Sequence, residues 1–119
     1  ASSAASDVYK RQGFRYAISD DKMEKYVSIT GYIGTKKDIE IPDMIEGYPV
    51  RILENMTFSN RDDLTSIIVP KTIKKVFNRA FPKTKKLTVY FLSDKKAFKR
   101  TNQWNIYWAP TIFNYKKED

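Results

Sequence analysis

The sequence predicts a mainly β protein, built as a short solenoid of stacked coils with a cap at each end. The first observation is a repeat, in which one pattern of apolar residues recurs at a constant offset of 23 positions. The matched pairs are Val50 and Ile73, Leu53 and Val76, Thr57 and Ala80, Phe58 and Phe81, and Leu64 and Leu87. The second observation is that a strand-like run ends in proline in both copies, at Pro42 and Pro70. A single coil cannot bury its own apolar edge, so neighbouring coils stack and share a core.

Composition supports one folded domain and excludes several chemistries. The chain has 119 residues, of which 41% are hydrophobic and 30% charged, as is typical of a globular domain. No apolar run approaches 18 residues, so no membrane span is expected. Cysteine and histidine are absent, which removes disulfides, thiolate nucleophiles, the commonest general base and the usual zinc ligands. We therefore expect no enzyme activity, no catalytic or metal site, and no cofactor.

Residues 1–13 are interpreted as a leader, and residues 14–119 as a single repeat domain. The first six residues, ASSAAS, resemble a linker, and DVYKRQ at 7–12 resembles the translated adaptor of a sequencing library. The segment has no hydrophobic region of the kind that a signal peptide needs. A chain without cysteine suits both a reducing cytosol and bacterial secretion without disulfides, so the residues alone leave the localisation unknown.

Residues 14–34 are predicted to form a β-hairpin that caps the first coil. Large and small side chains alternate in FRYAI at 14–18 and again in YVSIT at 26–30, as in half-buried strands. A polar turn, Asp20-Asp21-Lys22, separates the two runs. The hairpin would cover the side of the first coil that has no neighbour.

The repeat coils are predicted to span 35–92, with an insertion in the first copy. Pro42 and Pro70 lie 28 positions apart rather than 23, so the first copy holds five extra residues. We place these residues at 46–50, because Gly47 and Pro49 indicate a turn.

Each coil is predicted to combine a short strand with a more compact segment. Leu64 and the apolar residues after it suit a strand that Pro70 ends. From Ile73 to Phe81 the apolar residues are three and four positions apart, which suits a tight helical turn or a bent segment. Phe58 and Phe81 would each fill the interior of one coil.

Residues 93–119 are predicted to form an aromatic cap at the other end. LTVYFL at 87–92 reads as a further strand, but the Val-x-x-x-Ala-Phe pattern does not return after it. Terminal repeats of a solenoid differ from internal ones because one side of their core meets water. The residues expected to close that side are Trp104, Tyr107, Trp108, Ile112, Phe113 and Tyr115.

The sequence of these repeats resembles the BspA-type leucine-rich repeat family. The resemblance is carried over 14–92 by YVSITGYIGTKKDIEIPDMIEGYPV, by the Leu53-x-x-x-Thr57-Phe58 pattern and by LTSIIVPKTIKKVFNRAF. Thr57 stands where the family usually has alanine, and Glu54 and Phe77 where it usually has glycine. The resemblance implies a right-handed solenoid with a parallel sheet on one face. It also implies non-enzymatic recognition, commonly in adhesion at bacterial cell surfaces, and it transfers no site residue.

Positive charge is concentrated in one stretch of the chain. The net charge is +8, yet residues 70–100 hold eleven Lys or Arg against one acidic residue, a balance of +10 that leaves about −2 elsewhere. The candidate partner-binding residues are Lys71, Lys74, Lys75, Arg79, Lys83, Lys85, Lys86, Lys95, Lys96, Lys99 and Arg100. Such an excess indicates an acidic partner. The alternative is a coat of solvated lysines, and the sequence does not separate the two.

Two functions are therefore compatible with the sequence. The first is a module that binds another protein through the broad surface of the solenoid, as the family resemblance implies. The second is a factor that binds an acidic polymer or a nucleic-acid complex through residues 70–100. An S-x-x-K pattern at 93–96 matches one motif of serine acyl-enzymes, but the partner motifs of those enzymes are missing.

Overall fold

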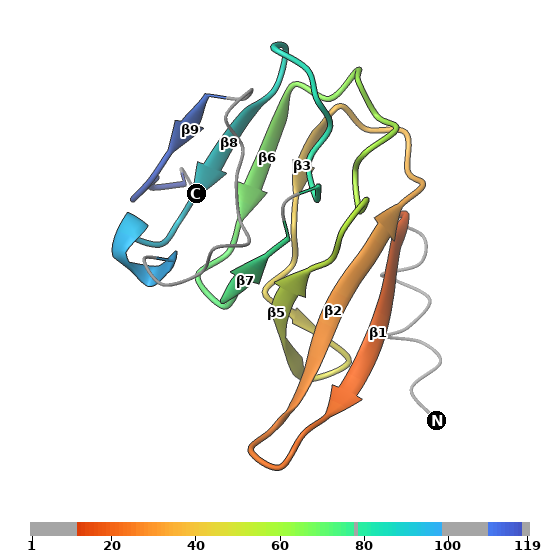
Figure 1. Ribbon diagram of the computed structural model, residues 1–119, viewed down its shortest axis with the longest axis vertical. Coiled ribbons are helices and arrows are strands. Elements are labelled where there is room, and N and C mark those ends of the chain that lie inside the picture. The colour runs from red at the N-terminus through yellow and green to blue at the C-terminus, as the bar shows by residue number, and fades with distance from the viewer. Residues whose placement is uncertain (1–11, 78, 99–109, 118–119) are drawn as a thin grey trace.

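The computed structural model describes residues 12–77, 79–98 and 110–117 and shows a solenoid whose coils have a β-sheet on each side (Figure 1). Most of the predicted leader lies outside these residues. One sheet holds β1 (Phe14–Asp20), β2 (Lys25–Tyr32), β5 (Tyr48–Leu53), β7 (Lys75–Val76) and the short β4 (Met44–Ile45). The other holds β3 (Asp38–Glu40), β6 (Ser66–Val69), β8 (Thr88–Phe91) and β9 (Thr111–Ile112). A 3₁₀ helix, η1 (Lys95–Phe98), follows β8.

Both sheets contain parallel pairs, which is the mark of a solenoid. In the four-stranded sheet all neighbours are parallel, in the order β3-β6-β8-β9. In the other sheet β2, β5 and β7 are parallel. The chain therefore passes from one sheet to the other and returns to the first sheet beside the strand that it left. β2 and β3 make up the first coil. The predicted parallel sheet is confirmed, and a second one faces it.

The segment expected to be a helical turn or a bend, residues 73–81, begins extended and ends bent. Lys75 and Val76 form β7, and the corresponding residues of the preceding coil belong to β5, whereas 79–81 form a turn and bends in which the amide of Ala80 donates to the carbonyl of Phe77 at 3.1 Å. The pairing of β2 with β5 is irregular, because Val27 lies opposite Val50 while Ser28 lies opposite Ile52. This bulge leaves Arg51 unpaired in the register, so the buried Val50 and Leu53 are three residues apart on an extended chain.

The predicted hairpin is present. β1 and β2 are antiparallel, from Phe14 opposite Tyr32 to Asp20 opposite Lys25. The five-residue insertion also takes the predicted place as the turn of a second hairpin, β4–β5. Glu46 and Gly47 have positive φ angles of 53° and 84°, as in the tight turns that join antiparallel strands.

The core confirms the repeat register. All ten residues of the five matched pairs are buried. A ladder of aromatic rings runs through the interior: the ring centroids of Phe14 and Tyr32 are 5.2 Å apart, those of Tyr32 and Phe58 are 6.0 Å apart, and those of Phe58 and Phe81 are 6.1 Å apart. Phe58 and Phe81 thus fill successive coils, as predicted.

Thr57 fits the buried place that alanine usually takes in the family. The side chain is 3% exposed, so its hydroxyl needs a partner. The hydroxyl donates to the carbonyl of Glu54 at 2.7 Å and lies 3.0 Å from the carbonyl of Ile29. This departure from the family pattern therefore ties the turn after β5 to β2.

The end of the solenoid departs from the 23-residue repeat. Ser66 pairs with Thr88, an offset of 22, so the last coil is one residue shorter on its way into β8. Beyond β8, the ring of Phe113 stacks on that of the buried Phe91 at 5.0 Å. Of the predicted cap, Trp104, Tyr107 and Trp108 lie outside the described residues.

Candidate binding surfaces

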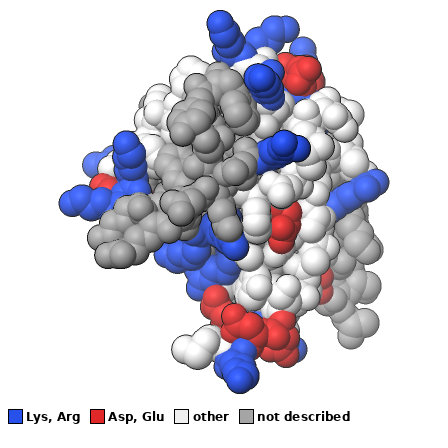
Figure 2. All heavy atoms as spheres, in the orientation of Figure 1, with Lys and Arg blue, Asp and Glu red and all other residues white. Residues whose placement is uncertain are grey.

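The predicted basic residues lie at different places around the last coil. Lys71 and Lys74 lie between β6 and β7, and Lys75 is the first residue of β7. Lys95 and Lys96 belong to η1. Arg79, Lys83, Lys85 and Lys86 lie in the connection from β7 to β8, and all four are exposed. Lys99 and Arg100 lie outside the described residues. In Figure 2 the basic side chains of this face form separate groups at the top, at the left and over β7.

Three exposed lysines, Lys83, Lys85 and Lys86, which we call the corner lysines, belong to the turn before β8, which lies at the top of Figure 1. None of the three has an ion-pair partner among the residues that the structure describes. Figure 2 shows basic side chains gathered there beside a small acidic group, whereas acidic side chains collect at the opposite end, over the turn between β1 and β2. The structure therefore separates a basic end from an acidic one.

The other basic residues have closer neighbours. The amine of Lys75 lies 4.6 Å from the ring centroid of Phe77. The backbone amide of Lys96 donates to the carboxylate of Asp94 at 2.7 Å. Lys74 and Lys75 also line a shallow hollow together with Glu24. These residues are therefore placed beside an aromatic ring or acidic side chains of the described chain.

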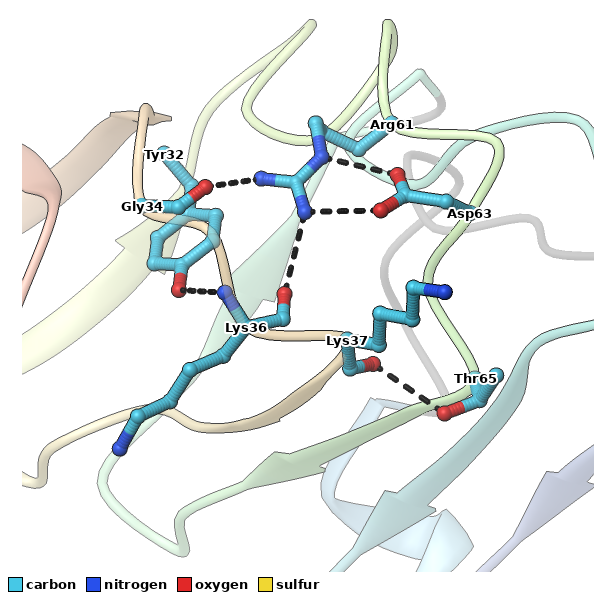
Figure 3. Close-up of polar contacts among 7 residues, drawn as sticks. All are labelled: Tyr32, Gly34, Lys36, Lys37, Arg61, Asp63 and Thr65. Atoms are coloured by element: carbon cyan, nitrogen blue, oxygen red, sulfur yellow. Dashed lines mark hydrogen bonds and ion pairs between the residues drawn. The ribbon is translucent and has the colours of Figure 1, made fainter.

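Arg61 holds the neighbouring loops in place, a role that no motif in the sequence indicates (Figure 3). Its guanidinium forms a bidentate pair with Asp63, at 2.9 and 3.1 Å. It also donates to the carbonyls of Gly34 and Lys36, the second at 3.1 Å. The guanidinium carbon lies 5.4 Å from the ring centroid of Tyr32. One side chain of the second coil thus holds the loop of the first coil in place.

Asp38 connects the first two strands of the four-stranded sheet. Its carboxylate accepts the hydroxyls of Ser66 at 2.6 Å and Thr65 at 2.7 Å. The hydroxyl of Thr65 also lies 3.3 Å from the carbonyl of Lys37. These contacts hold β3 beside β6 at one edge of the four-stranded sheet.

The outward surface of the four-stranded sheet is apolar along one row. The register places Glu40 beside Ile68, Ile68 beside Tyr90, and Tyr90 beside Ile112. The residues on either side of Glu40, Ile68 and Tyr90, such as Ile67 and Val89, are buried in the core, so these three side chains point outward. Ile112 is 43% exposed, and Ile68 and Tyr90 are half-buried. We call Glu40, Ile68, Tyr90 and Ile112 the face row.

A hollow of about 260 Å³ adjoins the face row. Its apolar lining comes from Ile68 and from the repeat corners that follow the strands, Pro42, Pro70 and Leu92. The remaining lining residues include charges of both signs: Glu40, Asp43, Lys71 and Lys117. An apolar centre within a charged rim is the usual anatomy of a protein–protein contact.

The sequence contains a pattern that indicates the face row, although the concentration of basic residues does not reveal it. A sheet with one face in water alternates between apolar and polar residues. SIIV in β6 and TVYF in β8 lack that alternation, since Ile68 and Tyr90 are large and apolar where a polar residue is expected. Such a strand is typically covered on both faces.

The described residues form no group of three or more acidic side chains that could hold a metal ion, and no helix among them could span a membrane. Four carboxyls have pKa values below their usual range, because hydrogen bonds stabilise the charged form. The main donors are Arg51 for Glu24, Ser66 and then Thr65 for Asp38, Arg61 for Asp63, and the amide of Lys96 followed by Asn114 for Asp94.

These shifts predict acid sensitivity. A carboxyl whose pKa is lower in the folded chain binds fewer protons there than in the unfolded chain, so its contribution to stability is present above the unfolded pKa. That pKa is 3.8 for Asp and 4.5 for Glu. We expect a constant melting temperature from about pH 7 to 5 and a fall below about pH 4.5. Below about pH 4.5 the melting temperature of Asp38→Asn should fall less steeply with pH than that of the parent chain. An equally steep fall would contradict the role of Asp38.

A crystal structure of a leucine rich cell surface protein from Faecalibacterium prausnitzii A2-165 is similar to this chain. The TM-score is 0.58 with 27% sequence identity, over 70% of this chain and 23% of the other. The chain thus spans about a quarter of that protein. The likeness confirms the leucine-rich repeat resemblance and the solenoid fold. No family model matches the chain, and no curated protein matches it.

Proposed function

We propose that this leucine-rich repeat chain is a non-enzymatic recognition module that binds another protein through the outward surface of the β3-β6-β8-β9 sheet. The face row carries the proposal. Ile68, Tyr90 and Ile112 lie side by side on a surface that faces away from the core, where water would favour polar residues. Tyrosine is enriched among the residues that contribute most to protein–protein binding.

The similar cell surface protein supports a location and a role for this module. We propose secretion or surface display and a part in adhesion, in agreement with the family resemblance. Leucine-rich repeat solenoids are extended surfaces in which each coil adds one strand to a common face. Here the coils present an apolar centre with Glu40, Asp43 and Lys71 around it, which suits a protein partner better than a small substrate.

The test is a comparison of two double variants that change charge equally on different faces. Ile68→Lys with Ile112→Lys alters the face row, whereas Ile18→Lys with Ile33→Lys alters exposed isoleucines elsewhere. Ile18, in β1, is 41% exposed and so matches Ile112 at 43%, while Ile33 is more exposed, at 64%. Each immobilised variant and the parent chain would be incubated with cell-surface extract, and the retained proteins quantified by mass spectrometry.

We expect the proteins that the parent chain retains to fall at least tenfold on the face-row variant and to stay unchanged on the other. A tenfold loss corresponds to about 1.4 kcal/mol of binding free energy, which is modest for two buried interface residues. Equal retention by both variants, with unchanged circular dichroism, would show that this face is not the binding surface.

A second function, binding of an acidic polymer, is favoured by the corner lysines. These three residues lack ion-pair partners in the described part of the chain and share one end of the solenoid with other basic side chains. Binding of the parent chain to immobilised heparin and single-stranded DNA over a salt series tests this alternative. Retention through the corner lysines would weaken steeply with salt. It would also be lost on reversing Lys83, Lys85 and Lys86 to Glu, but would not fall in either isoleucine variant, because both variants add positive charge.

A further inference from the structure

The chain covers part of the face row with one of its own segments, residues 113–117, which we call the return segment. Asn114 has a positive φ of 55°, which reverses the direction of the chain after β9. Its amide donates to the carbonyl of Ser93 at 3.0 Å, and its side-chain amide donates to Asp94 at 3.1 Å. The reversal directs the following residues back over the sheet rather than away from it.

Two contacts place the return segment on the face row. The ring of Tyr115 lies 4.6 Å from that of Tyr90, in β8, and the amide of Tyr115 donates to the carbonyl of Phe91 at 3.0 Å. The amine of Lys117 forms an ion pair with Glu40, in β3. Tyr90 and Glu40 are both members of the face row, with Ile68 between them. The C-terminal end of the described chain accordingly lies over the sheet in Figure 1.

The spacing of these contacts follows from the geometry of the sheet. Tyr90 and Glu40 are two strands apart, which is about 10 Å at the usual strand separation. Two residues of extended chain advance about 7 Å, and the stem of Lys117 supplies the rest. In an extended segment, an aromatic residue that contacts Tyr90 and a cationic residue that contacts Glu40 are therefore separated by about one residue.

The two ends of the return segment are held with different strength. Phe113 stacks on the buried Phe91, which anchors the start of the segment. At the other end, the side chains of Lys117 and Glu40 are 40% and 54% exposed. Ion pairs this exposed contribute little, because water screens them. The contact of Lys117 with Glu40 is thus weaker than the packing of Phe113 on Phe91.

We propose that the return segment occupies the site of a peptide ligand, and that the partner presents an aromatic residue followed two positions later by Lys or Arg. The proposal rests on the proposed function of the sheet face and specifies the chemistry of its partner. The partner's aromatic ring stacks on Tyr90, its cation pairs with Glu40, and its backbone donates to the carbonyl of Phe91. The return segment competes for the same contacts.

The experiment uses the full chain with Tyr115→Ala and Lys117→Ala, which keeps the Phe113 anchor. The probe is a capped, fluorescent peptide of residues 110–117, PTIFNYKK, titrated by polarisation against this variant and the parent chain. A tethered segment acts at an effective concentration of about 1 mM. The peptide is therefore expected to bind the variant at least tenfold more tightly than the parent chain. Equal affinity for both chains would overturn the proposal.

A charge swap tests the cationic contact separately. Glu40→Lys, added to the same variant, should weaken the peptide at least fivefold, and a peptide with Glu in place of its last Lys should restore binding. A peptide with Ala at the tyrosine position should lose binding to every chain. Absence of the rescue would overturn the aromatic-x-cation assignment. If the Ile68→Lys, Ile112→Lys variant alone still loses its protein partners, sheet-face binding stands and the peptide chemistry alone has failed.

Discussion

Replacement of Phe58 by alanine is expected to lower the free energy of unfolding by about 3–5 kcal/mol, as for buried phenylalanines in general. Phe58 is fully buried and lies in the aromatic ladder between Tyr32 and Phe81, with ring centroids 6.0 and 6.1 Å away. Its removal leaves a cavity between two coils and deprives both of their contact. A domain of this size has about 5–15 kcal/mol of stability in total, so a single such cavity removes a large share.

Chemical denaturation followed by circular dichroism measures this effect. Ile33→Ala is the matched control, because Ile33 is 64% exposed and lies outside the core, and its effect should stay within about 0.5 kcal/mol. Phe81→Ala should match Phe58→Ala, since Phe81 takes the equivalent place one coil further on. An unchanged unfolding midpoint in either phenylalanine variant would mean that the coils do not share this core.

The repeat made the core predictable, whereas a β-bulge in β5 kept the sheet of β2, β5 and β7 from being predicted. Matched apolar residues identify which side chains face inward whatever the backbone does, and all five pairs are buried. Val50 and Leu53 are three residues apart, which in an unbroken strand would put them on opposite faces. The bulge at Arg51 returns Leu53 to the inner face. A bulge depends on pairing with β2, and no property of the β5 residues alone reveals it.

The candidate binding surfaces were harder to predict, because residues that are close in the sequence of a solenoid lie at different places around its coils. Residues 70–100 exceed one full coil, so lysines that are close in sequence lie on several sides of the molecule. The face row has the opposite property. Ile68, Tyr90 and Ile112 come from three distant segments, and only the strand register brings them together. Charge density along the chain therefore located the basic corner lysines but not the apolar surface.

Arg61→Met is expected to lower the free energy of unfolding by about 2 kcal/mol, within the range for hydrogen bonds to charged groups. The change keeps the length of the side chain but removes every contact of the guanidinium. Gly34 and Lys36 lose the donor to their carbonyls, and Asp63 loses its bidentate partner. The side chain of Arg61 is only 20% exposed, so water replaces these bonds poorly.

Two further variants decide whether geometry or charge is responsible. Arg61→Lys keeps the charge but cannot reach two carbonyls and a carboxylate together, because the three donors of a lysine share one nitrogen while those of arginine are spread over a planar fork. It should recover less than half of the lost stability. Arg79→Met makes the same substitution at an exposed arginine in the connection from β7 to β8 and should change the melting temperature by less than about 2 °C. Full recovery by lysine would show that Arg61 acts through its charge alone, and the loop of the first coil would then be held by Tyr32 and the core rather than by the guanidinium.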